Sequence, residues 1–85
     1  MKLHLKFFAS LREALGPGEI LEWSPADVPT AGALRQWLRA RSEAHALALA
    51  PGRAVRVAVD QIMAGDATPL HDGAEVAFFP PVTGG

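Results

Sequence analysis

Most of this chain alternates apolar and polar residues with the two-residue period of a β-strand, and only one long segment repeats with the period of a helix. A single main helix can cover one face of a sheet, which restricts how the chain can bury its apolar side chains. The pattern therefore predicts the α+β class, with a mixed sheet of about four to five strands and one main helix packed across it. Strands are expected at residues 1–9, 19–23, 55–60 and 75–79, and a short edge strand is expected at 61–64.

The main helix is expected to begin after Thr30, a residue type suited to the N-cap position, and to run to about Arg41. Leu34, Trp37 and Leu38 recur at helical spacing. We therefore expect these three side chains to form the stripe of the helix that enters the core.

Shorter helical signals lie on both sides of the main helix. A capping box, with Ser10 as N-cap and Glu13 at the third helical position, predicts a short helix that Gly16 ends. Residues 42–50 are rich in Ala and Leu, so they form either an extension of the main helix or a short second helix.

The last predicted strand ends at Pro80 and Pro81, because proline cannot donate to a sheet ladder. Residues 82–85 offer too little apolar surface to pack as core, so we expect a domain of residues 1–81 and a flexible tail. Four extended residues span roughly 13 Å, and terminal glycines allow another backbone to approach closely. The tail would then present the carboxylate of Gly85 to a narrow pocket of another protein.

Phe8 and Phe79 do not fit the apolar rows of their strands, because each falls on the opposite face near a strand end. One explanation is a central strand that is buried on both sides, or an aromatic ring that shields its neighbours. Exposed aromatic residues beside one another would instead mark a surface for a partner. We favour the partner surface, since Phe79 directly precedes the prolines and would dock the domain so that the tail is aimed.

The composition excludes several kinds of site. The chain has no cysteine, so it offers no disulfide, no thiolate nucleophile and no thiolate metal ligand, and any sulfur chemistry must use something other than a side chain. The three histidines lack ligand-like spacing to acidic residues, and no serine has the glycine context of a nucleophile. We therefore expect neither a metal site nor an intrinsic catalytic centre. A formal net charge of −1, without a basic run or a long apolar segment, argues against nucleic acid and membrane partners and favours the cytoplasm.

Several short motifs occur together over the whole chain, and the most specific is the block at its end. The motifs are Phe7-Phe8-Ala9, Arg12-Glu13, Thr30, Ala33-Leu34-Arg35, Ala58-Val59, Leu70, Asp72-Gly73 and the run from Glu75 to Gly85, which contains Phe78-Phe79-Pro80-Pro81-Val82-Thr83-Gly84-Gly85. With these motifs the chain resembles the small, sulfur-carrying subunits of molybdopterin synthase, relatives of ubiquitin with the β-grasp fold. One departure is Asp60, where this family often carries Asn, and the change bears on a local hydrogen bond at the turn.

The resemblance implies a protein that is not an enzyme by itself but the sulfur-donor subunit of a sulfurtransferase complex. A partner of the ubiquitin-activating type would adenylate Gly85 with ATP, and no cofactor would be bound by this chain. A sulfur donor, typically a persulfide, would then displace AMP and leave a thiocarboxylate. The tail would enter the large catalytic subunit, within a heterotetramer, and pass its sulfur to cyclic pyranopterin monophosphate in molybdenum cofactor biosynthesis. The resemblance implies Gly84 and Gly85 as reacting residues, and Phe8, Met63, Phe79, Pro80, Pro81, Val82 and Thr83 as contacts with partners.

Three other functions stay open at this point. A sulfur carrier of the thiamine pathway has the same fold and the same diglycine, although the block before the diglycine and the length of the helical region favour the molybdopterin pathway. A protein modifier would join its glycine carboxylate to lysines of its targets, and isopeptide-linked adducts would reveal it. A plain interaction module with an inert tail would keep every activity after deletion of Gly85.

Overall fold

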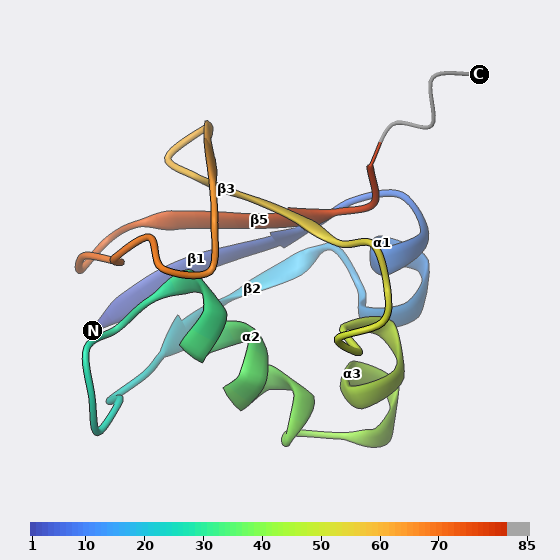
Figure 1. Ribbon diagram of the computed structural model, residues 1–85, viewed down its shortest axis with the longest axis horizontal. Helices are drawn as coiled ribbons and strands as arrows, with labels where there is room; N and C mark the ends of the chain where they lie inside the picture. The colour runs from blue at the N-terminus through green and yellow to red at the C-terminus, as the bar shows by residue number, and fades with distance from the viewer. Residues whose placement is uncertain (82–85) are drawn as a thin grey trace.

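The computed structural model describes residues 1–81 of the chain. Within this part, α2 and α3 lie on one side of the strands, as Figure 1 shows. The strands are β1 (Lys2–Phe7), β2 (Gly18–Glu22), β3 (Arg56–Val59), β4 (Ile62–Ala64) and β5 (Glu75–Phe79), and the helices are α1 (Ser10–Leu15), α2 (Ala31–Arg39) and α3 (Glu43–Ala48).

The strands form one mixed sheet in the order β2-β1-β5-β3-β4. β1 and β5 lie parallel in its interior, although they are the two strands furthest apart in the sequence, and the other neighbours pair antiparallel. β4 forms one edge, as predicted for residues 61–64. The predicted α+β class, the mixed sheet and the single longer helix are therefore confirmed.

The face of the sheet turned towards the helices carries the alternate apolar residues of its strands. In β1, Leu3, Leu5 and Phe7 are buried while the residues between them are exposed. Phe78 of β5 is the register partner of Phe7, and the two rings stack with centroids 6.1 Å apart. The period-two alternation thus places one row of each interior strand in a common core.

Side-chain caps fix the starts of the two helices that cover this face. The Oγ1 atom of Thr30 accepts a hydrogen bond from the backbone N–H of Ala33 at 3.1 Å, so α2 begins where the sequence predicts. The Oγ atom of Ser42 accepts one from the backbone N–H of His45, also at 3.1 Å. Of the two alternatives for residues 42–50, a short second helix is therefore correct.

The buried stripe of α2 differs from the prediction in one residue. Leu34 and Leu38 are fully buried, as expected, but Trp37 is 40% exposed, so its assignment to the core is wrong. Ala31 completes the buried stripe instead, which leaves Trp37 at the margin of the helix face. Its ring contacts that of Trp23, with centroids 6.4 Å apart.

The start of α1 also differs from the prediction. Ser10 is the first helical residue rather than the N-cap, and Ala9 occupies the cap position without a side-chain hydrogen bond, so the capping box is wrong. The reason is the ladder between β1 and β5, which continues through the backbone N–H of Phe8 to the carbonyl of Phe78 at 3.2 Å. The chain must then turn sharply at Ala9, whose φ is 53° and ψ is −130°. Such a backbone is strained for a residue other than glycine.

Candidate functional site

The face of the sheet opposite the helices, which we call the open face, carries an aromatic pair at one end. Phe7 and Phe78 are register partners that point into the core. The residues that follow them, Phe8 and Phe79, therefore lie at neighbouring positions on the open face. Phe8 is 44% exposed, and Phe79 is half-buried. The members of the open face around this pair are Lys6, Phe8, Ile20, Arg56, Ala58, Met63, Glu75, Ala77 and Phe79, of which Ala77 is buried.

Small residues connect this aromatic pair to the opposite edge of the sheet. Ala77 of β5 is the register partner of Ala58 of β3, and Ala58 is the partner of Met63 of β4. Met63 is 60% exposed, and its unbranched side chain adapts to irregular surfaces. The open face is thus a shallow apolar strip with large side chains at both margins, a shape suited to the contact of another protein.

An ion pair lies beside this strip. The Nζ atom of Lys6 is 2.7 Å from the Oε1 atom of Glu75, and both side chains are partly exposed. The two residues come from β1 and β5, so they link the strands that carry Phe8 and Phe79. Their opposite charges offset one another, but Arg56, the exposed register partner of Phe79 on β3, adds a positive charge beside the aromatic pair.

The base of the predicted tail follows directly from this surface. Pro80 and Pro81 are half-buried and continue from the end of β5. The other predicted site residues, Val82, Thr83, Gly84 and Gly85, lie outside the described residues. The structure therefore brings Phe8, Phe79 and the two prolines together, and it places Met63 on the same face three strands away from β1.

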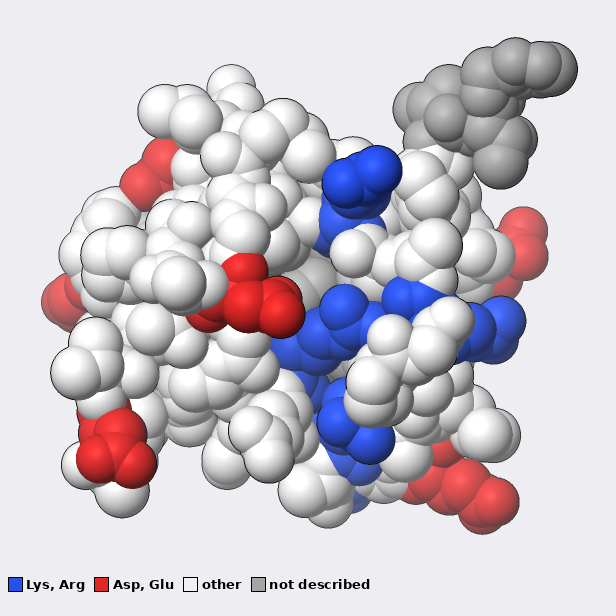
Figure 2. Space-filling model, viewed as in Figure 1, with Lys and Arg blue, Asp and Glu red and all other residues white. Residues whose placement is uncertain are grey.

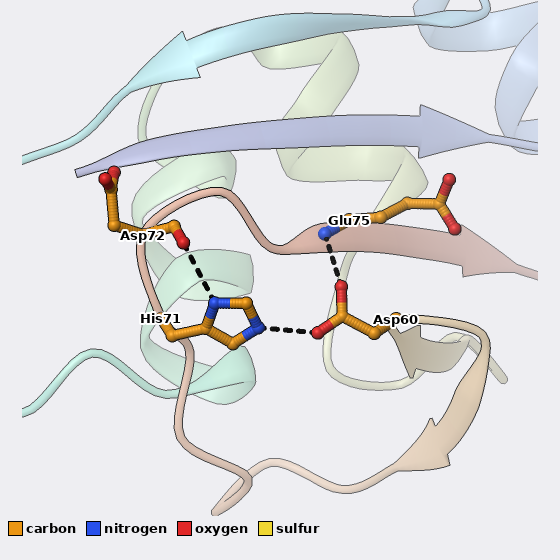
Figure 3. Close-up of polar contacts among 4 residues, drawn as sticks. All are labelled: Asp60, His71, Asp72 and Glu75. Carbon is orange, nitrogen blue, oxygen red and sulfur yellow. Dashed lines mark hydrogen bonds and ion pairs between the residues drawn. The ribbon is translucent and has the colours of Figure 1, made fainter.

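Asp60 holds the turn before Met63 in place, as Figure 3 shows. Asp60 and Gln61 have φ angles of 51° and 67°, a combination typical of tight two-residue hairpin turns. The Oδ1 atom of Asp60 accepts a hydrogen bond from the backbone N–H of Glu75 at 3.0 Å, and its Oδ2 atom lies 2.6 Å from Nε2 of His71. The carboxylate of Asp60 thus fixes the turn through a backbone hydrogen bond and forms an ion pair with His71 when the imidazole is protonated.

These contacts shift two pKa values in opposite directions. The hydrogen bond from the backbone of Glu75, together with that from His71, lowers the pKa of Asp60. The hydrogen bond to Asp60, followed by that to the backbone oxygen of Asp72, raises the pKa of His71. Both groups are exposed, so the pair positions the turn more than it stabilises the domain.

The described residues hold no group of three or more His, Cys, Asp or Glu side chains placed to bind a metal ion. Within residues 1–81, none of the helices has both the length and the apolar character that a membrane span requires.

Ile20 is one residue of this surface that the sequence analysis did not select. It is the register partner of His4 in β1 and is 65% exposed on the open face. The signal was present, because Ile20 alternates out of phase with the buried residues Leu21 and Trp23.

Known proteins resemble this chain over most of its length. Residues 5–85 match the ThiS family. The molybdopterin synthase sulfur carrier subunit of Escherichia coli is 51% identical, with 93% of this chain and 94% of that protein aligned. The subunit of the same name from Haemophilus influenzae is 42% identical over 98% and 99% of the two chains. The small archaeal modifier protein 3 of Haloferax volcanii is 36% identical over the full length of both.

Solved structures share the fold. A Haloferax volcanii protein known from a solution structure superposes with a TM-score of 0.74 at 33% identity, over all of this chain and 87% of its own. A chain from the protein-protein complex of subunits 1 and 2 of the molybdopterin-converting factor of Helicobacter pylori superposes with a TM-score of 0.67 at 24% identity, over the full length of both. The expected β-grasp, ubiquitin-like fold is thereby confirmed.

Proposed function

The chain belongs to the ThiS family, and we propose that it is the sulfur carrier subunit of a molybdopterin synthase. The relative from Escherichia coli that bears this name is 51% identical over nearly the whole of both chains, and this likeness carries the proposal. The open face supports it, since an apolar surface directly before Pro80 is what a protein needs if a partner is to receive the residues that follow.

The chemistry would take place at the carboxylate of Gly85. An oxygen of this carboxylate attacks the α-phosphate of ATP on an activating enzyme, pyrophosphate leaves, and an acyl-adenylate forms. The terminal sulfur of a donor's persulfide then attacks the carbonyl carbon and AMP leaves. A second thiol of the donor cleaves the sulfur-sulfur bond, which releases the thiocarboxylate and leaves the donor as a disulfide. Sulfur can thus be carried although the chain contains no cysteine.

The sulfur would then pass to cyclic pyranopterin monophosphate in a large catalytic subunit. Phe8, Phe79 and Met63 would bind this subunit, Pro80 and Pro81 would direct the chain into it, and hydrolysis would return the carboxylate of Gly85. The complex of subunits 1 and 2 in Helicobacter pylori supports a large partner of this kind, because one of its chains has the fold of this protein. We propose a heterotetramer, with catalytic groups supplied by the large subunit. The cytoplasmic location stays a prediction.

The mass of the intact protein tests the proposal. After incubation with ATP, a sulfide source and an activating enzyme, we expect a gain equal to one exchange of oxygen for sulfur, mapped to Gly85. A chain that lacks Gly85 serves as the control and should gain nothing. Absence of the gain, with an enzyme shown to activate another carrier, would contradict the proposal.

The 36% identical modifier protein of Haloferax volcanii supports a second candidate function, the covalent modification of other proteins. The same acyl-adenylate would then react with a lysine amine of a target and form an isopeptide bond. Extracts that contain the tagged chain distinguish the two functions. Isopeptide-linked adducts that depend on Gly85 would favour the modifier, and a free thiocarboxylate without adducts would favour the carrier.

A further inference from the structure

Three arginines lie together on the helix side of the domain, away from the open face. Arg35 and Arg39, one helical turn apart on α2, line a hollow of about 220 Å³ together with Pro51 and Asp66. Arg53 follows in the turn after α3. Its backbone carbonyl accepts a hydrogen bond from Nη2 of Arg35 at 3.3 Å, and its own Nε donates to the carbonyl of Leu47 at 3.3 Å. We call these three residues the arginine cluster. Figure 2 shows that Lys and Arg side chains gather in the middle of the face that carries α2 and α3.

The cluster is not neutralised within the described part of the chain. No carboxylate of residues 1–81 lies within 4.0 Å of Arg35, Arg39 or Arg53, whereas Arg41 pairs with Glu19 at 2.6 Å. Asp66 lines the same hollow without reaching ion-pair distance. The three arginines therefore form no ion pair within residues 1–81, although the carboxylate of Asp66 faces the hollow that Arg35 and Arg39 line.

The three arginines differ in what they do for the fold. Arg35 has a structural role, because its Nε and Nη2 atoms donate to the carbonyls of Leu49 at 2.9 Å and Ala50 at 2.7 Å. Arg39 has no such role, since its Nε is buried without a hydrogen-bond partner in residues 1–81. Burying a charged N–H without an acceptor destabilises a protein, so folding alone does not favour an arginine at this position.

Arg53 connects the cluster to the base of the tail. It lines a second hollow, of about 190 Å³, whose wall also includes Leu11, Ala48 and Pro80. A protein that holds the residues after Pro81 must pass close to this hollow and can extend from it across Arg53 towards Arg39.

We propose that the arginine cluster binds an acidic segment of the large catalytic subunit that takes up the tail. This inference rests on the proposed function for the identity of the partner, and on charge complementarity for its chemistry. Guanidinium groups bind carboxylates through charge-assisted hydrogen bonds, and unpaired cations accelerate the approach of an acidic surface. The open face and the arginine cluster would then contact a partner on opposite sides of the base of the tail.

A titration with hexaglutamate tests the surface directly. At low ionic strength, the amide resonances of residues 35, 39 and 53 should shift, and the shifts should disappear at high salt because exposed charges are screened. Arg39→Gln and Arg53→Gln should each weaken binding about threefold, and Asp66→Asn should strengthen it by a similar factor. Arg41→Gln is the matched control and should change nothing, since Arg41 already has a partner. Equal affinities for all of these proteins would overturn the proposal, as would a DNA hexanucleotide that binds the cluster when hexaglutamate does not.

A second measurement separates this inference from the proposed function. With the large subunit, the double variant Arg39→Gln/Arg53→Gln should raise the KM for the carrier and leave kcat unchanged. Unchanged kinetics would overturn the inference and leave the carrier function intact. Absence of sulfur transfer to Gly85 of the wild type, in assays without hexaglutamate, would reject the carrier function alone if hexaglutamate still binds the cluster in the separate titration.

Discussion

Phe7 and Phe78 lie on the buried side of the same two strands whose next residues, Phe8 and Phe79, face outward. Phe7 and Phe78 are 2% and 1% exposed, whereas Phe8 is 44% exposed and Phe79 is half-buried. One step along a strand thus separates a side chain that holds the sheet on its helices from one that is free to contact another protein. The difference predicts that stability and the proposed partner binding rest on different residues in the same short segments, so mutation should separate them.

The largest effect is expected on the buried side. Phe78→Ala should lower the free energy of unfolding by about 3–5 kcal/mol, because it removes a fully buried ring from the core and leaves a cavity. Urea unfolding measures this change. Phe79→Ala is the matched control and should cost about 1 kcal/mol. Similar losses in the two variants would show that the two sides of β5 do not differ in this way.

Association with the large subunit, in contrast, should depend on the outward-facing Phe79. Phe79→Ala should weaken association with the large subunit by about 2 kcal/mol, or roughly thirtyfold, as expected for an aromatic contact at an interface. Titration calorimetry with that subunit measures the effect. Ile20→Ala, on the same face but two strands away from β5, should change the affinity less. An unchanged dissociation constant for Phe79→Ala would count against the partner surface.

A smaller effect is expected at the turn that follows the aromatic pair. Ala9→Gly should raise the free energy of unfolding by about 1 kcal/mol, because glycine relieves the strain of a φ of 53°. Ala14→Gly, at an exposed position inside α1, should lower it by about the same amount. Thermal unfolding of both variants gives the comparison, and a loss of stability at both positions would contradict the strain at Ala9.

The smallest effect concerns the ion pair between Asp60 and His71, at the turn before Met63. The pKa of His71 is raised in the folded protein, so its contribution to stability is complete below about pH 6.5 and disappears as the pH rises through the higher folded value. The pKa of Asp60 is lowered, so its contribution is present above about pH 4 and is lost as the pH falls through the lower folded value. Wild type should therefore exceed His71→Gln in melting temperature near pH 5–6, and the difference should vanish at about pH 8–9. A difference that does not depend on pH would exclude the ion pair as its cause.

The sequence predicts the strands well, because β1 alternates between exposed and buried residues and β5 begins and ends where expected. β5 does not alternate in this way, since Val76, Ala77 and Phe78 are all buried. The sequence also predicts the cap at Thr30, because that contact joins residues close together in the chain. The errors at Ser10 and Trp37 have non-local causes. The ladder from Phe8 to β5 displaces the start of α1, and the orientation of α2 on the sheet leaves the tryptophan at the margin.

The candidate site likewise has features that the sequence predicts and features that depend on the fold. Phe8 and Phe79 could be selected from the sequence because each breaks the alternation of its own strand. Their proximity could not be derived from periodicity, since it depends on the parallel pairing of two segments about 70 residues apart. The sequence does not predict the arginine cluster, because Arg53 is brought to Arg35 only by the turn after α3.

The parallel pairing of β1 with β5 also has a consequence for the order in which a growing chain can fold. β1 is made early, but its partner in the sheet interior is the last strand, and long-range pairings form slowly. A nascent chain without β5 leaves the edges of β1 and β3 open and lacks half of the aromatic pair. Unfinished copies therefore cannot display the complete open face. A partner that bound the open face would select chains in which synthesis has already reached the residues leading into the tail.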